Sequence, residues 1–568
     1  MDARVQYGQK PWLKYYPEGI PAQIDIPEKS VPQVFDEAVE KWRDRTAVIF
    51  YGRKITYSEL RDDVDRFAAA LFDLGVKKGD KVALYLLNCP QFIIAYFAAL
   101  KVGATLTPIS PVYVSGEVKH QIEDSEAKVI VCQDLLYDCV EKAGVGLRAV
   151  ILTGIGEYLP ALKKFMAKTV VRSVYKKMEV PSTKIFEREG FYQFQSLIKK
   201  YPPDPPKIQI DPREDLAVLP YTGGTTGLPK GAMLTHYNLV ANEAQGQAFW
   251  SRVLEEGKEV VIAYLPFYHI YGQVVVMLGG LVRGYTLVLF TTPDVDDILG
   301  AIESHRATAF YSVPTLYDVL KDHDKTDRVN WKRFKILVSG ADALLEDTAK
   351  GFERRTGVEI NEGYGLTETS PITHSNPKGR TKIGSFGVPV PSTMAAIVHS
   401  EKEEFLPLGE IGEIVIQGPQ VMKGYWKNPE ETSEKLVDIE GEKWFRTGDL
   451  GSMDDEGYFH FYDRKRDLIK YKGYSVFARE IEEVLTSHPK IKEAGVIGVR
   501  DPRVGENIKA AIVLEAEARG KLSEEEIISY CKERLAHYKV PRIVEFRGEI
   551  PKTDVGKVSH RELREEMG

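Results

Sequence analysis

The segment Tyr221-Thr-Gly-Gly-Thr-Thr-Gly-Leu-Pro-Lys-Gly231 is the strongest local signal in this sequence. The apolar run Leu216-Ala-Val-Leu219 precedes it and predicts a strand that ends where the glycines begin. Glycines allow a tight turn and a close approach of the backbone to a ligand. The freed N–H groups, the threonine hydroxyls and the Lys230 ammonium suit phosphate oxygens. The segment therefore predicts a phosphate-binding loop, although Pro229 before the lysine separates it from the Walker type of loop.

Short apolar runs alternate with helical patterns across the larger, N-terminal part of the chain. The first run precedes a helical pattern over 91–102, and the later runs each follow a helix-like segment. Alternation of this kind predicts an α/β fold of layered, largely parallel sheets. The predicted strands are 81–87, 128–132, 286–290, 308–311 and 335–338.

Composition narrows the class of protein. The chain has 568 residues, with 76 Lys and Arg against 83 Asp and Glu, and its formal net charge is −7. A chain of this length can bury a large core without disulfides, and its four cysteines form no CxxC pair. The mild acidity argues against a nucleic-acid partner. The N-terminus lacks a basic-then-apolar signal pattern, so we expect a cytoplasmic protein.

One uncharged segment, Val260–Val282, has the length of a membrane helix, which needs about 20 apolar residues. Pro266, His269, Gly272 and Gln273 interrupt it. A buried strand, a loop and a buried helix therefore explain the segment better than a membrane span does.

A basic segment at 157–179 breaks the alternating pattern. Lysines and arginines lie there without any acid between the two flanking glutamates, and apolar residues recur at roughly helical spacing. The Pro-rich stretch 201–206 follows it like a linker. One interpretation is a basic amphipathic helix that makes peripheral contact with an anionic membrane. The other, which we favour, is a solvated helix on a surface insertion at about 157–206.

A second change of pattern surrounds Asp463-Arg-Lys-Arg-Asp467. The strand-like run 457–462 precedes it, and a compact α+β segment follows, long enough for a small domain. Helices are predicted at 479–487 and 523–537, and Cys531 lies on the apolar face of the second. We therefore expect Cys531 in the core rather than in a reactive site.

The loop at 221–231 closely resembles the signature of the adenylate-forming superfamily, which comprises acyl-CoA synthetases, adenylation domains of peptide synthetases and luciferases. That family usually has serine where this chain has Gly223, which removes a hydroxyl and keeps the flexible turn. Further matches follow in the family's order from about residue 30 to the end, and the pattern is most similar to medium- or long-chain fatty acid–CoA ligases. These matches are YLPFYH at 264–269, GYGLTE at 363–368, WFRTGD at 444–449, DR at 463–464, KYKG at 470–473 and PKTDVGK at 551–557.

This resemblance implies a two-step reaction. A carboxylate attacks the α-phosphate of ATP and releases pyrophosphate, and the thiol of coenzyme A then attacks the acyl-adenylate. The first step brings an anion to a polyanion, so it needs cations and backbone donors. The implied partners are a small-molecule carboxylic acid, ATP, Mg²⁺ and coenzyme A, and the oligomeric state stays open between monomer and homodimer.

The resemblance also assigns roles to single residues. Glu368 is the implied Mg²⁺ ligand, because a hard carboxylate suits a hard cation, and Thr367 donates to the α-phosphate. His269 orients the substrate carboxylate, and Tyr364 stacks on adenine. Asp449 accepts hydrogen bonds from the ribose hydroxyls. The other residues assigned to ATP are Thr222, Gly223, Gly224, Thr225, Thr226, Gly227, Lys230, Gly340, Ala341, Gly365 and Arg464.

The second step requires different residues of the C-terminal domain to face the same site. By resemblance, Lys557 bridges carboxylate and phosphate during adenylation, and the C-terminal domain then rotates about a hinge near Arg466. Lys470 and Gly473 face the site afterwards, because glycine leaves room for the pantetheine arm. The predicted domains are an N-terminal AMP-binding domain at 1–463, with the insertion at about 157–206, and a mobile C-terminal cap at 467–568.

The predicted acyl pocket is apolar and has no charged selector. It therefore favours a medium- or long-chain fatty acid, and an aryl or phenylpropanoid acid is the alternative. A nucleotide-binding regulator without catalysis is the alternative from another class, and intact Glu368, Asp449 and Lys557 argue against it. The residues assigned to the acyl pocket are Tyr271, Val274, Val313, Gly340 and Gly363.

Overall fold

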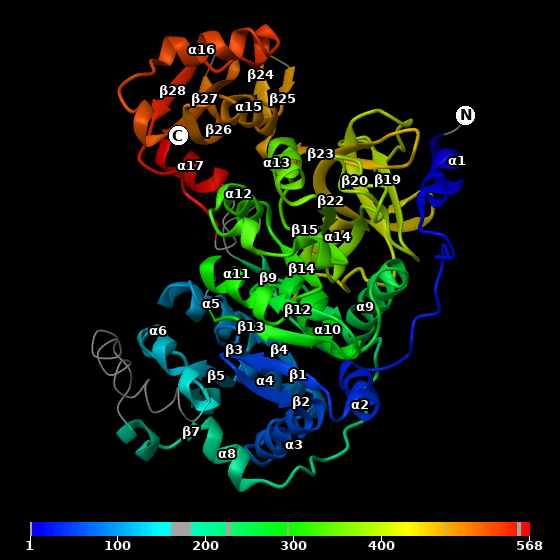
Figure 1. The fold of residues 1–568 in the computed structure, drawn as a ribbon, viewed down its shortest axis with the longest axis vertical. Coiled ribbons are helices and arrows are strands. Elements are labelled where there is room, and N and C mark those ends of the chain that lie inside the picture. Colours follow the sequence, from blue (N-terminus) through cyan, green and yellow to red (C-terminus); the bar gives the residue numbers. More distant parts are fainter. Residues whose placement is uncertain are drawn as a thin grey trace. The chain divides into compact units, whose positions relative to one another are not determined.

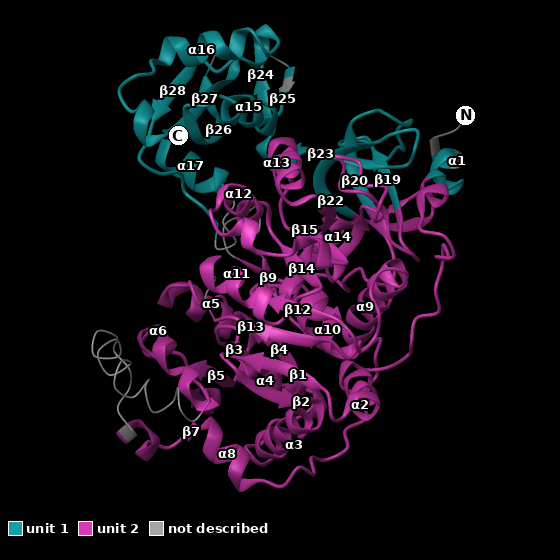
Figure 2. Ribbon diagram, in the orientation of Figure 1, with its two compact units in different colours: residues 1–11, 395–415, 446–568 teal, residues 12–394, 416–445 magenta. Residues whose placement is uncertain are grey.

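The computed structural model describes residues 3–160, 183–222, 229–291, 295–472, 474–501, 503–553 and 558–567. Contacts divide the chain into two compact units (Figure 2). Unit 1 consists of 1–11, 395–415 and 446–568, and unit 2 consists of 12–394 and 416–445. Each unit is described by itself below. The predicted domain boundary near Arg466 stays a prediction.

Unit 2 contains a nine-stranded sheet, most of whose central strands run parallel (Figure 1). Its core strands are buried, except for the partly exposed first residue of β12, and rich in β-branched and aromatic residues, as expected where both faces are covered. In spatial order the strands are β18 (Val388–Pro389), β17 (Ile372–Ser375), β16 (Asn361–Gly365), β15 (Ile336–Ser339), β14 (Ala309–Ser312), β12 (Val260–Ala263), β13 (Thr286–Leu289), β1 (Thr46–Phe50) and β2 (Arg53–Thr56).

A second sheet of seven strands lies in the same unit, and its strands are parallel except at the β11 edge. A separate hairpin pairs β9 (Tyr221–Thr222) with β10 (Lys230–Gly231). In spatial order the seven strands are β11 (Leu234–Thr235), β8 (Leu216–Val218), β4 (Thr105–Pro108), β3 (Lys81–Tyr85), β5 (Val129–Gln133), β6 (Ala149–Thr153) and β7 (Phe191–Gln193).

The helices of unit 2 begin where the sequence supplies caps. Thr56 and Glu59 form a capping box at the start of α3, and Pro90 occupies the first turn of α4, which is apolar on all sides and buried. These helices are α2 (Val31–Trp42), α3 (Tyr57–Asp73), α4 (Pro90–Lys101), α5 (Ser115–Ser125), α6 (Tyr137–Ala143), α8 (Phe194–Lys200), α9 (His236–Trp250), α10 (Gly279–Val282), α11 (Val295–Ser304), α12 (Pro314–Asp322), α13 (Glu346–Thr356) and α14 (Pro429–Lys435).

The predicted fold class is confirmed, because layered α/β sheets form the larger part and an α+β segment forms the smaller, C-terminal part. Each predicted strand is present within two residues of its expected bounds. The uncharged segment 260–282 comprises strand β12, a loop, the buried π-helix η5 (Tyr271–Leu278) and α10, as predicted. No helix among the described residues has the length and apolar character needed to cross a membrane. Most of the basic segment 157–179 lies outside the described residues.

Unit 1 contains antiparallel strands and the C-terminal α+β segment. Strand β22 pairs with β23 and neighbours β20, while β26 and β27 form a long hairpin that pairs with β24 and β28. The elements are α1 (Ala3–Gly8), β19 (Met394–Val398), β20 (Gly412–Gln417), β22 (Glu442–Met453), β23 (Phe459–Arg464), β24 (Ile469–Tyr471), β25 (Tyr474–Val476), α15 (Ala478–Thr486), β26 (Ile491–Asp501), β27 (Gly505–Leu514), α16 (Glu524–Lys532), β28 (Ile543–Phe546) and α17 (His560–Met567); the first residues of β19 and β22 and the last of β20 belong to unit 2, as does β21 (Leu436–Ile439).

The C-terminal segment has its own apolar core. Ile481 of α15, Val496 of β26 and Ile512 of β27 are fully or almost fully buried in it. Cys531 is buried in the same core, as predicted. Helix α16 ends at Lys532, earlier than predicted, because the chain turns after it and brings Leu535 onto the same core.

A buried histidine joins two helices of unit 2. His236, the first residue of α9, is 1% exposed, and its Nδ1 accepts a hydrogen bond of 3.2 Å from the backbone N–H of Val31 in α2. Burial lowers the pKa of His236 to about 4. The folded state therefore holds this ring neutral, whereas the unfolded chain protonates it near its ordinary value of about 6.5.

We expect His236 to make the stability of unit 2 depend on pH. Because the folded pKa lies below the unfolded one, the stabilisation is present above about pH 6.5 and is lost as the pH falls toward 4. Between pH 7.5 and 5 the loss from this group is about 2 kcal/mol. Urea unfolding of wild type and His236→Gln at both pH values measures it, and an equal pH dependence of the two proteins would contradict it.

Candidate functional site

Four parallel strands of unit 2 end at one edge of the nine-stranded sheet, where ligands of α/β proteins usually bind. Strands β12, β14, β15 and β16 are those four. Tyr264, just after β12, makes a 2.6 Å hydrogen bond between its hydroxyl and Ser312 Oγ at the end of β14. The N–H of Gly340, just after β15, donates to the carbonyl of Ser312 at 3.1 Å. Hydrogen bonds between strand ends thus fix the loops that carry the predicted residues.

The loop after β15 has a strained backbone. Ala341 has a φ of 70°, in the left-handed region that disfavours residues with a Cβ atom. Such strain is most often found at binding sites, where the surrounding structure maintains it. The conformation lies directly beside Gly340, which the sequence assigned to both the nucleotide and the acyl chain.

Tyr271 in the π-helix η5 contacts the same loop. A Cβ atom on Gly340 would lie 3.1 Å from the Tyr271 ring, so glycine is needed for this close approach. The Tyr271 hydroxyl is buried and makes no hydrogen bond within the described residues, and burial raises its pKa well above the ordinary value. Val274, one turn further on, is buried as well. The predicted pocket residues Tyr271 and Gly340 are therefore in contact.

His269 precedes η5, and its orientation is fixed by the helix start. Its Nδ1 accepts a hydrogen bond of 3.3 Å from the backbone N–H of Tyr271. In the neutral ring the proton is therefore on Nε2, which can donate to an oxygen. The ring is half-buried. This geometry suits a residue that orients a carboxylate.

Tyr364 in β16 is supported from behind by two aromatic rings. Its ring centre lies 4.4 Å from that of Phe386, and His374 lies at 5.8 Å. His374 is fully buried, and burial lowers its pKa to about 3, so it is neutral. A Cβ atom on Gly365 would lie 1.8 Å from the carbonyl oxygen of Pro371, so no other residue fits there. The ring of Tyr364 is thus fixed by packing, as a stacking platform requires.

Glu368 lies in a short 3₁₀ turn, Thr367–Thr369, and is half-buried. Its Oε1 accepts a 2.7 Å hydrogen bond from the hydroxyl of Tyr425, whose pKa is raised by burial and by this carboxylate. The backbone carbonyl of Glu368 accepts from the N–H of Met422 at 2.9 Å. In the described part of the chain no lysine, arginine or histidine pairs with Glu368. An oriented carboxylate without a protein cation fits a Mg²⁺ ligand that shares the ion with phosphates.

The two ends of the phosphate loop are anchored, whereas Gly223, Gly224, Thr225, Thr226 and Gly227 lie outside the described residues. Thr222 pairs with Lys230 across the β9–β10 hairpin. At the first end, the hydroxyl of Tyr221 donates to Asp124 Oδ2 at 2.5 Å. At the second end, His120 Nε2 lies 3.0 Å from the carbonyl oxygen of Pro229. Helix α5 therefore holds both ends of the loop.

Lys230 is paired with an acid that the sequence did not identify. Its Nζ lies 2.6 Å from Glu431 Oε2 in α14, and both side chains are mostly buried, at 10% and 13% exposed. Tyr425, Glu431 and Asp124 all stand far from their partners in sequence, so no spacing pattern links them. Only the fold shows these contacts.

Unit 1 brings Asp449 and Arg464 together. They face each other across the β22–β23 ladder, and Arg464 Nε lies 3.4 Å from Asp449 Oδ1. Asp449 is 3% exposed. Lys470 is exposed on β24, and its backbone N–H donates to Glu506 at 2.7 Å. Gly473 and Lys557 lie outside the described residues.

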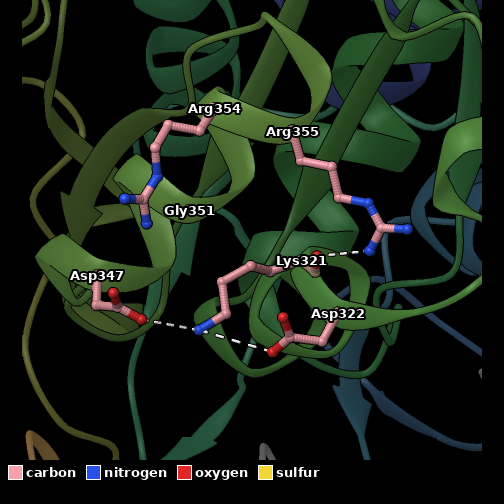
Figure 3. A pocket seen from close by; sticks show the side chains of 6 residues that line it. All are labelled: Lys321, Asp322, Asp347, Gly351, Arg354 and Arg355. Carbon is pink, nitrogen blue, oxygen red and sulfur yellow. Dashed lines mark hydrogen bonds and ion pairs between the residues drawn. The ribbon is translucent and has the colours of Figure 1, made fainter.

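Figure 3 shows a surface cavity of about 420 Å³ between α12 and α13, which contains none of the predicted site residues. Charged side chains line it, and the Lys321 ammonium points between Asp347 at 2.9 Å and Asp322 at 3.8 Å. A charged lining of this kind cannot hold an alkyl chain. The cavity is therefore not the predicted acyl pocket.

Comparison with known proteins gives the family. The model of the AMP-binding enzyme family matches residues 35–426, and that of the AMP-binding enzyme C-terminal domain matches residues 480–557. The chain belongs to the AMP-binding enzyme family. The predicted membership of the adenylate-forming superfamily and the predicted enzyme class, an AMP-forming acid–thiol ligase, are thereby confirmed.

Individual relatives extend over the full length. A long-chain-fatty-acid–CoA ligase of Bacillus subtilis (strain 168) is 40% identical over 562 residues, 98% of each chain. A 4-coumarate–CoA ligase-like protein of Oryza sativa subsp. japonica is 33% identical and covers 98% of this chain and 95% of its own. The crystal structure of ATP-bound MatB from Rhodopseudomonas palustris matches with a TM-score of 0.82 at 29% identity, over 95% of this chain and 99% of that one.

Glu368→Gln should lower acid-dependent pyrophosphate release by at least about 100-fold, because the neutral amide is a poor Mg²⁺ ligand. Tyr425→Phe should have a smaller effect, about fivefold, through loss of one hydrogen bond to Glu368. Pyrophosphate assays over a range of Mg²⁺ concentrations measure both effects. Glu359→Gln, which removes a half-buried ion pair with Lys378 and retains an amide oxygen that can accept from the N–H of Gly379, is the control. A Glu368→Gln enzyme with the Mg²⁺ dependence of wild type would contradict the assignment.

Proposed function

We propose that this protein is an ATP-dependent, AMP-forming ligase that activates a long-chain fatty acid and transfers the acyl group to coenzyme A. The observation that carries the proposal is the match over 98% of both chains to a ligase of that name. The uncharged segment at 260–282 supports an apolar acyl site beside Tyr271. ATP and coenzyme A are then co-substrates.

In the adenylation step a carboxylate oxygen forms a bond to the α-phosphorus, and the bond from that phosphorus to the bridging oxygen breaks, so that pyrophosphate leaves with the electron pair. Lys230 and the loop N–H groups offset the charge on the phosphates. Thr367 donates to the α-phosphate, and His269 orients the carboxylate from Nε2. The carboxylate is already ionised at neutral pH, so no general base is needed.

The remaining residues fix the nucleotide and its charge. Tyr364 stacks on adenine, with Gly340, Ala341 and Gly365 beside it, and Asp449 and Arg464 bind the ribose. Glu368 holds Mg²⁺, which neutralises phosphate charge when it is bound. These assignments rest on the family resemblance together with the contacts described above.

The thiolation step requires a second arrangement of the C-terminal segment. We assign the hinge to Arg466, between the 1–463 domain and the 467–568 cap, with Lys557 withdrawn and Lys470 and Gly473 facing the site. The thiol of coenzyme A then gives up its proton to solvent, and its sulfur forms a bond to the acyl carbon. The bond from that carbon to the phosphate oxygen breaks, so AMP leaves with the electron pair. Closure in each state keeps water from the adenylate.

The acyl pocket and the cellular setting complete the proposal. Each methylene buried in an apolar tunnel contributes about 0.8 kcal/mol, so affinity rises with chain length until the tunnel is filled. For the basic segment at 157–179 we favour a solvated surface helix, and peripheral contact with anionic lipid, which would let a cytoplasmic enzyme meet such acids at their membrane, is the alternative. Sedimentation with anionic vesicles, with and without residues 157–179, tests that contact, and unchanged vesicle binding after the deletion would contradict it.

A panel of acids tests the substrate class. We expect coenzyme A-dependent pyrophosphate release to increase by roughly three- to fourfold per methylene with saturated acids until the tunnel is filled, and to be low with cinnamate-type acids. The rice relative makes the aryl acid the alternative. Faster turnover of a hydroxycinnamate than of any fatty acid would replace the proposed substrate. No acid-dependent release at all would favour a regulator without catalysis.

Lys557→Ala should separate the two half-reactions. We expect adenylation to fall by at least about 100-fold, because an ammonium no longer bridges the two anions. Reaction of a preformed acyl-adenylate with coenzyme A should change by less than about threefold, well under 1 kcal/mol. The matched control is Lys552→Ala, five residues before Lys557 in the sequence. This substitution removes an ion pair in which Lys552 Nζ lies 2.9 Å from Glu493 Oε1. Equal loss in both half-reactions would contradict the role.

A further inference from the structure

A buried acid lies beside the part of strand β22 that carries Asp449. Glu413 in β20 is 2% exposed. Its Oε2 accepts hydrogen bonds from Arg446, at 3.1 Å from Nε and 2.5 Å from Nη2. Its Oε1 accepts from the backbone N–H of Gly448 at 3.1 Å. A carboxylate with a guanidinium fork and a backbone donor is compensated and fixed in place.

The same carboxylate also contacts the residue that follows strand β23. Lys465 Nζ lies 3.4 Å from Glu413 Oε2, and both Lys465 and Arg446 donate to the carbonyl of Ser400. Gly448 precedes Asp449, and Lys465 follows Arg464. Glu413 therefore holds a neighbour of each member of the Asp449–Arg464 pair.

This part of β22 is held by β20 at two consecutive residues, Glu413 and Ile414. Gly448 has a φ of 76°, a conformation that glycine adopts without strain. Next to it, Thr447 Oγ1 donates to the carbonyl of Ile414 at 2.8 Å and accepts from the N–H of Asp449 at 3.0 Å. With Glu413 on Gly448 and Ile414 on Thr447, the backbone on the N-terminal side of Asp449 has little freedom.

We infer that Glu413 is a positioning residue for ribose recognition, which fixes the β22 backbone at Gly448 so that the Asp449 carboxylate is held in the orientation that accepts the nucleotide hydroxyls. The inference rests on the proposed ribose-binding role of Asp449. It assigns to Glu413 an effect on one part of ATP only. Both carboxylate oxygens of Glu413 accept hydrogen bonds from protein donors, so we assign its effect to the backbone at Gly448 rather than to contact with the nucleotide.

Comparing nucleotides with and without ribose hydroxyls separates an effect of Glu413 on the position of Asp449 from an effect on folding. In wild type, kcat/KM with ATP should exceed that with 2′,3′-dideoxy-ATP, which has no ribose hydroxyls. Glu413→Gln keeps the shape and removes the charge that fixes Arg446. We expect it to reduce the ATP to dideoxy-ATP ratio by about tenfold, mainly through KM, and to leave kcat/KM with dideoxy-ATP within about twofold. Equal losses with both nucleotides would mean a purely structural role and would overturn the inference.

Two further variants distinguish the outcomes. Asp449→Asn should reduce the ratio of kcat/KM with ATP to that with dideoxy-ATP to about one. Adding Glu413→Gln to Asp449→Asn should not change this ratio further. If Asp449→Asn keeps the ratio, the proposed ribose role fails; if it abolishes the ratio while Glu413→Gln keeps it, only the present inference fails. If Glu413→Gln does not fold, Arg446→Lys repeats the test, because lysine retains the positive charge and lacks the paired donors of the guanidinium. An unchanged ATP to dideoxy-ATP ratio in Arg446→Lys would overturn the inference. Glu410→Gln, exposed three residues earlier, is the control and should match wild type.

Discussion

The nine-stranded sheet and its site depend on one constraint: several parallel strands end at the same edge, and the backbone groups of the loops that follow them need hydrogen-bond partners. The hydrogen bonds of Ser312 to Tyr264 and to Gly340 supply some of them. Other positions at this edge are kept free by glycine, as at Gly365, where a Cβ atom would overlap a carbonyl oxygen. The edge is therefore rigid and still has backbone surface available to a flat nucleotide.

Several charged groups among the predicted site residues already have a partner of opposite charge in the protein. Lys230 is paired with Glu431, and Asp449 is paired with Arg464. A reaction between an anion and a polyanion gains most from charges that need no reorganisation. Glu368 differs, because its contact is a tyrosine hydroxyl and leaves the charge available to a metal ion.

Local patterns allowed the sequence to predict the strands and the motif residues, because apolar runs and glycine turns are local properties. The end of α16 was misplaced, since an apolar face that continues to Leu535 looks helical although the chain turns after Lys532. Tyr425, Glu431 and Glu413 were missed for a different reason. Each meets its partner only through the fold, across 57 residues for Tyr425 and Glu368 and 35 for Glu413 and Gly448. The substrate class came from resemblance, which residue spacing alone does not supply.

The contacts of unit 1 also show what a rotation about Arg466 would have to break. The Glu413–Lys465 pair lies before the hinge, and the apolar core that begins at Ile469 lies after it, so both would survive. Among the described residues, the contacts that cross it include a 3.3 Å hydrogen bond from the N–H of Arg479 to Asp463, the Arg479 guanidinium at 5.2 Å from the centre of the Phe461 ring, and a tilted ring contact of 5.8 Å between Tyr462 and Phe477. Burial raises the pKa of Asp463 to about 6, so this carboxyl would be more readily ionised in water than in its present place. A desolvated acid and a long hydrogen bond stabilise a joint weakly, which is compatible with the proposed rotation of this segment between two arrangements.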